Sequence, residues 1–196
     1  DIRDQCKKTL TALNQDAVVV EEVKPTANPH YLSESWKRLR SKSLYDELVN
    51  YKLSEEEKIL SVNWEIRNGK VIKEEDIDEA LLWRSLWDKD ISSIFKKYDY
   101  LALPSTQVHP FNKDIPSPTA INGDQMETYH QWMDIVVLAS ILGLPTISVP
   151  VGFSREGLPV GMQLIGKRKS DTNLVAFAKK YEAIFNYSDV IPKHLS

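Results

Sequence analysis

The chain has 196 residues, of which 42% are apolar and 27% charged, and its formal net charge is −3. These values predict a globular protein that is either one domain with a core or one domain plus a helical appendage. The mixed charges argue against a nucleic-acid surface, which usually carries a basic stripe. No apolar run reaches the roughly 20 residues that cross a bilayer and no signal peptide is apparent, so we expect a cytoplasmic protein without membrane or nucleic-acid partners.

The N-terminal segment predicts a helix followed by a strand. Over residues 1–15, four apolar residues share one helical face: Ile2, Cys6, Leu10 and Leu13. Cys6 is the only cysteine, which excludes an internal disulfide and a cysteine-based zinc site. Its place in the apolar stripe favours a buried thiol over a reactive one. The β-branched run Val18–Val20 then predicts a short strand.

Residues 31–98 have helical patterns throughout. A Ser-x-x-Glu capping box at Ser54 predicts a helix that begins at Glu55 and ends at Asn68-Gly69. A longer helix is predicted from about Glu74 to Lys97, with this apolar stripe: Ile77, Leu81, Trp87, Ile91, Ile94 and Phe95. Acidic clusters in the first turns of both helices are interpreted as partners of the helix dipole.

The C-terminal half predicts a series of strands and helices. In chain order these are a strand Tyr100–Leu103, a proline-rich loop 104–123, a buried helix 126–142, strands Thr146–Val151 and Pro159–Ile165, and a helix capped by Asp171. Gly143 is expected to end the buried helix. The strand Thr146–Val151 is nearly all apolar, so we expect it to be central and covered on both faces.

This order of elements predicts an α/β fold. We expect a partial mixed sheet of about four strands with helices on both faces. Four strands are few for this length, and such a sheet would leave one edge open. We expect a single domain over residues 1–196, with a helical insertion at about 31–98 and a sheet region at 99–185.

The residue types name no reaction by themselves. The four histidines lack metal-ligand spacing, so no metal site is expected. The sequence has no Gly-x-Ser-x-Gly elbow and no glycine-rich phosphate loop, so neither the usual hydrolase signal nor a nucleotide cofactor is predicted.

One stretch of the chain nevertheless has a distinctive pattern. Gly-Leu-Pro-x-x-Ser-Val-Pro-x-Gly-Phe is followed by Gly-Leu-Pro-Val-Gly-x-Gln-Leu-Ile-Gly, over Gly143–Phe153 and Gly157–Gly166. These motifs closely resemble the C-terminal part of the amidase signature family. The resemblance extends over three further segments: Val18–Pro25, Tyr98–Thr106 and Asp171–Glu182.

The resemblance implies an amide hydrolase whose catalytic groups lie elsewhere. In this family a nucleophilic serine, a second serine on a cis peptide bond and a lysine precede the region matched here. The adjacent serines Ser92-Ser93 lie within a predicted helix, where a cis bond would cost several kcal/mol, so we reject them as the family's pair. We therefore expect an inactive C-terminal fragment, without catalytic residues, of an enzyme that hydrolyses a small carboxylic amide to an acid and ammonia or an amine.

The resemblance also implies that this half forms part of the substrate pocket. The candidate substrate-binding residues are Thr106 and Gln107, after the strand that ends at Pro104, and Trp132 and Met133, at the start of the buried helix. Ser105 joins the first pair, and Tyr129 is a weaker candidate. For each of these residues, a role in packing is slightly favoured over contact with a substrate. The run Val137–Ser140 stands where many members have polar residues, which hints at an apolar amide.

Two other functions remain open. The chain is either a stand-alone binding or interaction module that lost its catalytic half, or the A-type subunit of a tRNA-dependent amidotransferase, which shares this family. As a fragment, it is expected to bind its missing N-terminal half or to self-associate through an exposed sheet face.

Overall fold

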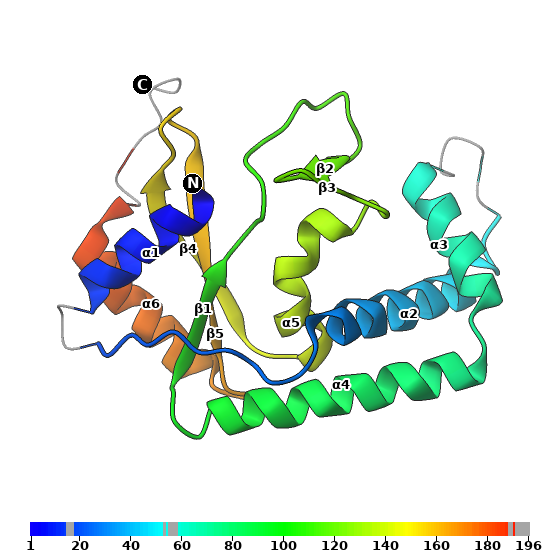
Figure 1. Cartoon of the computed structure of the whole chain (residues 1–196), viewed down its shortest axis with the longest axis horizontal. Helices are drawn as coiled ribbons and strands as arrows, with labels where there is room; N and C mark the ends of the chain where they lie inside the picture. Colours follow the sequence, from blue (N-terminus) through cyan, green and yellow to red (C-terminus); the bar gives the residue numbers. More distant parts are fainter. Residues whose placement is uncertain (15–17, 53, 55–58, 188–189, 191–196) are drawn as a thin grey trace. The chain divides into compact units, whose positions relative to one another are not determined.

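Two groups of elements make up the fold in the computed structural model, which describes residues 1–14, 18–52, 54, 59–187 and 190. One unit comprises residues 1–24 and 95–196 and contains the main sheet, and the other comprises residues 25–94 and is helical. Each unit is described by itself (Figure 1). Among the described helices, none has the length and apolar character needed to cross a membrane.

The main sheet has three antiparallel strands: β1 (Tyr100–Pro104), β4 (Thr146–Phe153) and β5 (Pro159–Gly166). Their order is β1-β5-β4, so β5 is the central strand. The predicted α/β class is confirmed, and the three strands lie close to their predicted positions. The described strands are all antiparallel, where a mixed sheet of about four strands was expected.

The predicted central position of Thr146–Val151 is wrong, because β4 lies at an edge of the described sheet. Along β4, Val149 and Val151 are buried whereas Ser148 and Pro150 are exposed. An apolar run does not distinguish a central strand from an edge strand that helices cover on one face. Pro150 has no N–H to donate to a neighbouring strand, which suits an edge position.

The strand predicted at Val18–Val20 does not form. This segment pairs with no described strand, and Val19 is 78% exposed. The Asn14 side chain instead accepts a hydrogen bond from the Val20 backbone N–H at 2.9 Å. β-Branched residues favour an extended backbone, but a strand also needs a neighbouring strand to pair with.

Two helices cover one face of the sheet, α1 (Ile2–Leu13) and α6 (Asp171–Phe185), as Figure 1 shows. The main hydrophobic core lies between them and the strands. Its buried members include Ile2, Cys6, Leu13, Val149, Val151, Val160, Met162, Leu164, Leu174, Ala178 and Tyr181. The N-terminal helix and its apolar face are thus confirmed. The residue that precedes α6 is Ser170, so the predicted capping role of Asp171 is wrong.

The Cys6 thiol is buried in this core, as its position in the apolar stripe predicted. Its side chain is 3% exposed, and burial raises the pKa of the thiol. Because the thiolate is the reactive form, we expect Cys6 to react with a thiol reagent at pH 8 only when the chain unfolds. Labelling with and without urea, followed by absorbance, measures this, and equal rates in both conditions would contradict it.

Tyr181 links α6 to the edge strand. Its hydroxyl donates to the Pro150 carbonyl oxygen at 2.6 Å, and burial raises the pKa of this tyrosine above its ordinary range. We expect Tyr181→Phe to lower the free energy of unfolding at neutral pH by about 1 kcal/mol.

The same substitution has a defined pH dependence. Since the folded pKa of Tyr181 lies above the unfolded one, its contribution is complete below pH ~10 and is lost as the pH rises further. The difference between wild type and Tyr181→Phe should therefore shrink above pH ~10 in urea titrations. A difference that grows there would contradict this assignment.

Helix α5 (Asp134–Leu142) lies on the other side of the sheet (Figure 1). It follows a short 3-10 helix, η1 (Gln131–Met133), so the predicted start of this helix at residue 126 is wrong. The residues before it form a small hairpin of β2 (Ala120–Ile121) and β3 (Asp124–Gln125). Gly143 ends α5 with a φ of 61°, as predicted, because a left-handed conformation favours glycine.

Three helices form the second unit: α2 (Pro29–Leu48), α3 (Leu60–Val71) and α4 (Glu74–Ile94). Trp87 and Ile91 of the predicted α4 stripe are buried, but Leu81 is 42% exposed. The expected end of α3 at Asn68-Gly69 is wrong, because the helix continues to Val71. The expected start at Glu55 lies outside the described residues.

Gly69 does not end α3 but lies where α3 packs against α2. A Cβ atom at Gly69 would lie 2.2 Å from the Ser41 carbonyl oxygen and 2.4 Å from the Tyr45 Cβ, both in α2. Its missing side chain therefore allows α2 and α3 to approach closely. Near this contact the buried Glu65 carboxylate of α3 accepts hydrogen bonds from Arg40 and Ser41.

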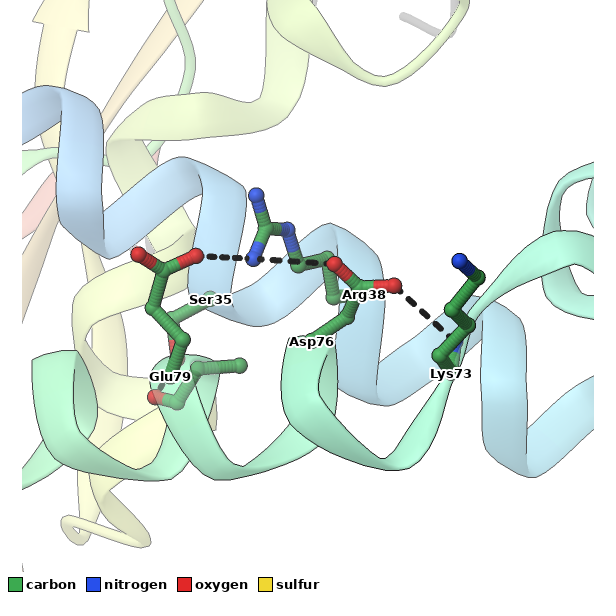
Figure 2. A network of polar contacts seen from close by, with 6 residues as sticks. Ser35, Arg38, Lys73, Asp76 and Glu79 are labelled. Atoms are coloured by element: carbon green, nitrogen blue, oxygen red, sulfur yellow. Dashed lines mark hydrogen bonds and ion pairs between the residues drawn. The ribbon is translucent and has the colours of Figure 1, made fainter.

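Polar contacts join α2 to α4 (Figure 2). The Arg38 guanidinium donates to Glu79 at 2.6 Å and lies 3.8 Å from Asp76, and the Ser35 hydroxyl donates to the Ala80 carbonyl oxygen. Asp76 also accepts a hydrogen bond from the Lys73 backbone N–H at the start of α4, as a first-turn acid can. These contacts orient one face of α4 towards α2.

Candidate functional site

The candidate site lies on the sheet face that carries α5, and its central residue is Gln163 of β5. The Gln163 side chain is buried, with 3% exposed. Its amide nitrogen donates to the Pro104 carbonyl oxygen, at the end of β1, and to the Ile135 carbonyl oxygen, in the first turn of α5, both at 2.9 Å. A single side chain thus joins the two segments in which the candidate substrate-binding residues lie.

Gln107 forms a second link between these segments. Its side-chain oxygen accepts a hydrogen bond from the Ile135 backbone N–H at 3.0 Å. The first N–H groups of a helix have no partner within the helix, so Gln107 satisfies one of them in α5. Thr106 makes a local turn, since its hydroxyl donates to the Val108 carbonyl oxygen at 3.0 Å.

Two serines meet above the central strand. The hydroxyls of Ser105, after β1, and Ser148, in β4, are 2.7 Å apart. Gly161 of β5 lies beneath them, and a Cβ there would be 3.2 Å from each hydroxyl oxygen. The missing side chain of Gly161 therefore leaves room for these two hydroxyls.

The other two predicted residues lie before α5. The Trp132 ring meets the Phe111 ring edge to face, with centroids 5.5 Å apart. The Met133 backbone N–H donates to the His130 carbonyl oxygen at 2.7 Å. The structure therefore brings Gln107 together with the start of α5 that follows Trp132 and Met133, whereas the observed hydrogen bonds of the Thr106 side chain are local.

The observed contacts do not activate Ser105 or Ser148 as a nucleophile. A serine needs an adjacent base to become nucleophilic, and the observed side-chain partner of each of Ser105 and Ser148 is the other serine. Ser92 and Ser93 lie in α4 with exposed side chains. A hollow of about 180 Å³ lies along β4 and α6, and Ser148 is among its lining residues, whereas the four predicted site residues are not.

Sequence reasoning missed Gln163 and Ser148 as members of this site. Each is a polar residue within a mostly apolar strand, and this was the available signal. Their roles depend on the register, which pairs Ser148 with Gln163 across β4 and β5.

The antiparallel sheet and the helices on its two faces define an α/β protein. The Amidase family profile matches residues 1–175. The chain belongs to this family, as the motifs around Gly143 and Gly157 indicated.

Curated relatives have more than one function. The chain is 28% identical over 192 residues to fatty acid amide hydrolase of Arabidopsis thaliana, a match that covers 94% of this chain and 30% of that protein. It is 39% identical over 92 residues to fatty acid amide hydrolase of Medicago truncatula, covering 46% of this chain and 15% of the relative. It is also 36% identical over 110 residues to the A-type subunit of glutamyl-tRNA(Gln) amidotransferase from Sulfolobus acidocaldarius, covering 56% and 21%.

Solved structures share the fold at lower identity. A bacterial aryl acylamidase of the amidase signature family matches with a TM-score of 0.84 and 22% identity, over 95% of this chain and 41% of that one. A 6-aminohexanoate cyclic dimer hydrolase complexed with substrate matches with a TM-score of 0.78 and 18% identity, over 100% and 43%. The chain therefore spans less than half the length of these relatives.

Proposed function

We propose that this chain is the C-terminal part of an amidase that hydrolyses a small carboxylic amide to an acid and ammonia or an amine. The family match over residues 1–175 carries this proposal. A Ser-cisSer-Lys set outside Asp1–Ser196 supplies the nucleophile and the base, and this chain supplies a wall of the substrate pocket. The chain alone is inactive.

Two observations support this division of roles. The chain aligns with 41% of the aryl acylamidase and 43% of the cyclic dimer hydrolase, which leaves more than half of either chain unmatched. The site on this chain holds two segments together through Gln163 and Gln107 but pairs its serine hydroxyls only with each other. Both observations support a chain that contributes to substrate binding while the catalytic groups lie outside it.

Reading the coding sequence upstream of Asp1 tests the proposal first. We expect an in-frame extension that contains a lysine and a Gly/Ser-rich segment with two serines. The extended protein should then hydrolyse aryl or fatty amides, whereas the chain Asp1–Ser196 should not. Enzyme-like amide hydrolysis by this chain alone, or an inactive extended protein that retains the serines and lysine, would contradict the proposal.

We further propose that Thr106, Gln107, Trp132 and Met133 line the substrate pocket. In the extended enzyme, Trp132→Ala and Met133→Ala should raise KM for an apolar amide more than they lower kcat, because they remove contacts made in the ground state and transition state alike. Phe111→Ala is the matched control, since it removes the aromatic partner of Trp132 without removing a proposed contact.

A second candidate function is the A-type subunit of a tRNA-dependent amidotransferase. The 36% identity over 110 residues to the Sulfolobus acidocaldarius protein favours it. The apolar run Val137–Ser140 argues for the amidase instead. Ammonia release from glutamine, compared with release of amine from an aryl amide by the same extended protein, distinguishes the two.

A further inference from the structure

Helix α4 has an apolar exposed face that the packing of the helical unit leaves uncovered. Leu81, Leu82 and Leu86 are 42%, 59% and 48% exposed. The opposite face of the same helix is buried through Ala80, Trp87 and Ile91. A helix with one buried face usually has a polar face on the other side, so three exposed leucines at its middle need an explanation.

Charges at the two ends of this leucine patch have opposite signs. Asp78 lies one turn before Leu82, and Lys89 lies one turn after Leu86, so these four residues share one helical face. Asp78 and Lys89 are both exposed, and no described residue forms an ion pair with either. The nearby acids Asp76 and Glu79 point instead towards Arg38 of α2, as Figure 2 shows.

The charges on this face of α4 are complementary to those of a second α4 helix that runs in the opposite direction. If two α4 helices pack antiparallel, with a two-fold axis at the level between Trp83 and Arg84, Asp78 of each copy faces Lys89 of the other. The leucines then meet at the centre, within roughly 4 Å of the axis along the helix at a rise of 1.5 Å per residue. Parallel packing would place Asp78 against Asp78, so the charges favour the antiparallel arrangement.

We propose that the exposed face of α4 is a docking surface for a second copy of this chain, with a two-fold axis that pairs Asp78 with Lys89. A two-fold interface uses the same patch on both copies, which a self-complementary stripe satisfies. The leucines supply apolar contact and the two ion pairs set the direction of packing. The proposal is independent of the amidase function, since it concerns the helical unit alone.

Charge exchange tests this geometry directly. In sedimentation equilibrium of the purified chain, we expect a reversible monomer–dimer equilibrium in the wild type. Asp78→Lys and Lys89→Asp should each weaken dimerisation by about tenfold or more, because each places like charges opposite one another. A mixture of the two single variants should dimerise as the wild type does, because each ion pair in the heterodimer again joins one lysine to one aspartate.

Two further variants complete the experiment. Glu47→Lys changes an exposed charge on α2 by the same amount as Asp78→Lys and should leave dimerisation unchanged. Leu82→Ser should weaken dimerisation in all combinations, with circular dichroism used to verify that the helices are retained.

Three results would overturn the proposal. The first is a wild-type chain that stays monomeric at every concentration, which would leave this face for a different partner. The second is a dimer that neither single charge variant weakens, which would indicate another surface such as the open edge of β4. The third is a mixture of the single variants that remains monomeric.

Discussion

Replacing Gly69 with alanine should destabilise the helical unit by about 2 kcal/mol or more, since overpacking typically costs roughly 1–3 kcal/mol. Helix propensity predicts the opposite sign, because alanine is favoured over glycine within a helix by about 1 kcal/mol. Packing prevails because the new Cβ would lie 2.2 Å from the Ser41 carbonyl oxygen, which belongs to the backbone of α2. A backbone atom cannot rotate away, so α2 and α3 must separate.

That separation would disturb more than one contact. The buried Glu65 carboxylate accepts hydrogen bonds from Arg40 at 2.9 Å and from Ser41 at 2.6 Å across the same interface. A buried carboxylate that loses its partners destabilises the folded state. This effect should lower the free energy of unfolding of Gly69→Ala further.

Urea unfolding followed by tryptophan fluorescence measures the effect of Gly69→Ala. Four of the five tryptophans lie in the helical unit: Trp36, Trp64, Trp83 and Trp87. Gly157→Ala is the control, because nothing lies within 4 Å of a Cβ at Gly157 and only its φ of 80° opposes the substitution. If Gly69→Ala stabilises the chain, the close approach of α2 and α3 is wrong.

The second large effect is expected for Gln163→Leu, which should lower the free energy of unfolding by about 2 kcal/mol, since each hydrogen bond contributes roughly 1 kcal/mol. Leucine fills a similar volume but cannot donate to the Pro104 and Ile135 carbonyl oxygens. Because Gln163 is buried, water cannot readily replace these bonds. The loop after β1 should then detach from the start of α5.

Hydrogen exchange separates this local effect from a general loss of stability. In Gln163→Leu, exchange should increase most at the amides of residues 105–107 and at the Ile135 amide, which donates to Gln107. The control is Gln125→Leu, the same substitution at an exposed glutamine of β3, which should change neither stability nor exchange. Uniformly faster exchange over the sheet would indicate that Gln163 only fills the core.

In the proposed extended amidase, the same variant would test the pocket. Loosening the two segments that carry Gln107, Trp132 and Met133 should lower kcat/KM, because a small misplacement of positioning groups has a large effect on rate. Normal kinetics in a Gln163→Leu enzyme would place the substrate elsewhere.

Local signals in the sequence determined much of this protein. The apolar spacing of Ile2, Cys6 and Leu13 identified α1 and its buried face. The glycine at position 143 identified the end of α5, where the structure shows a left-handed backbone conformation. The motifs around Gly143 and Gly157 identified the family. These features depend on residues close together in the chain, so a single sequence contains them.

Tertiary structure alone decided the features that depend on distant partners. Val18–Val20 has the propensity of a strand but no neighbouring strand, and Thr146–Val151 is apolar yet lies at an edge. Gly69 resembles a helix stop but is a contact with α2. Gln163 joins Pro104 to Ile135, residues that lie 59 and 28 positions away from it in the chain. Strand order, helix contact and side-chain hydrogen bonds arise only when distant segments meet, so composition and periodicity do not contain them.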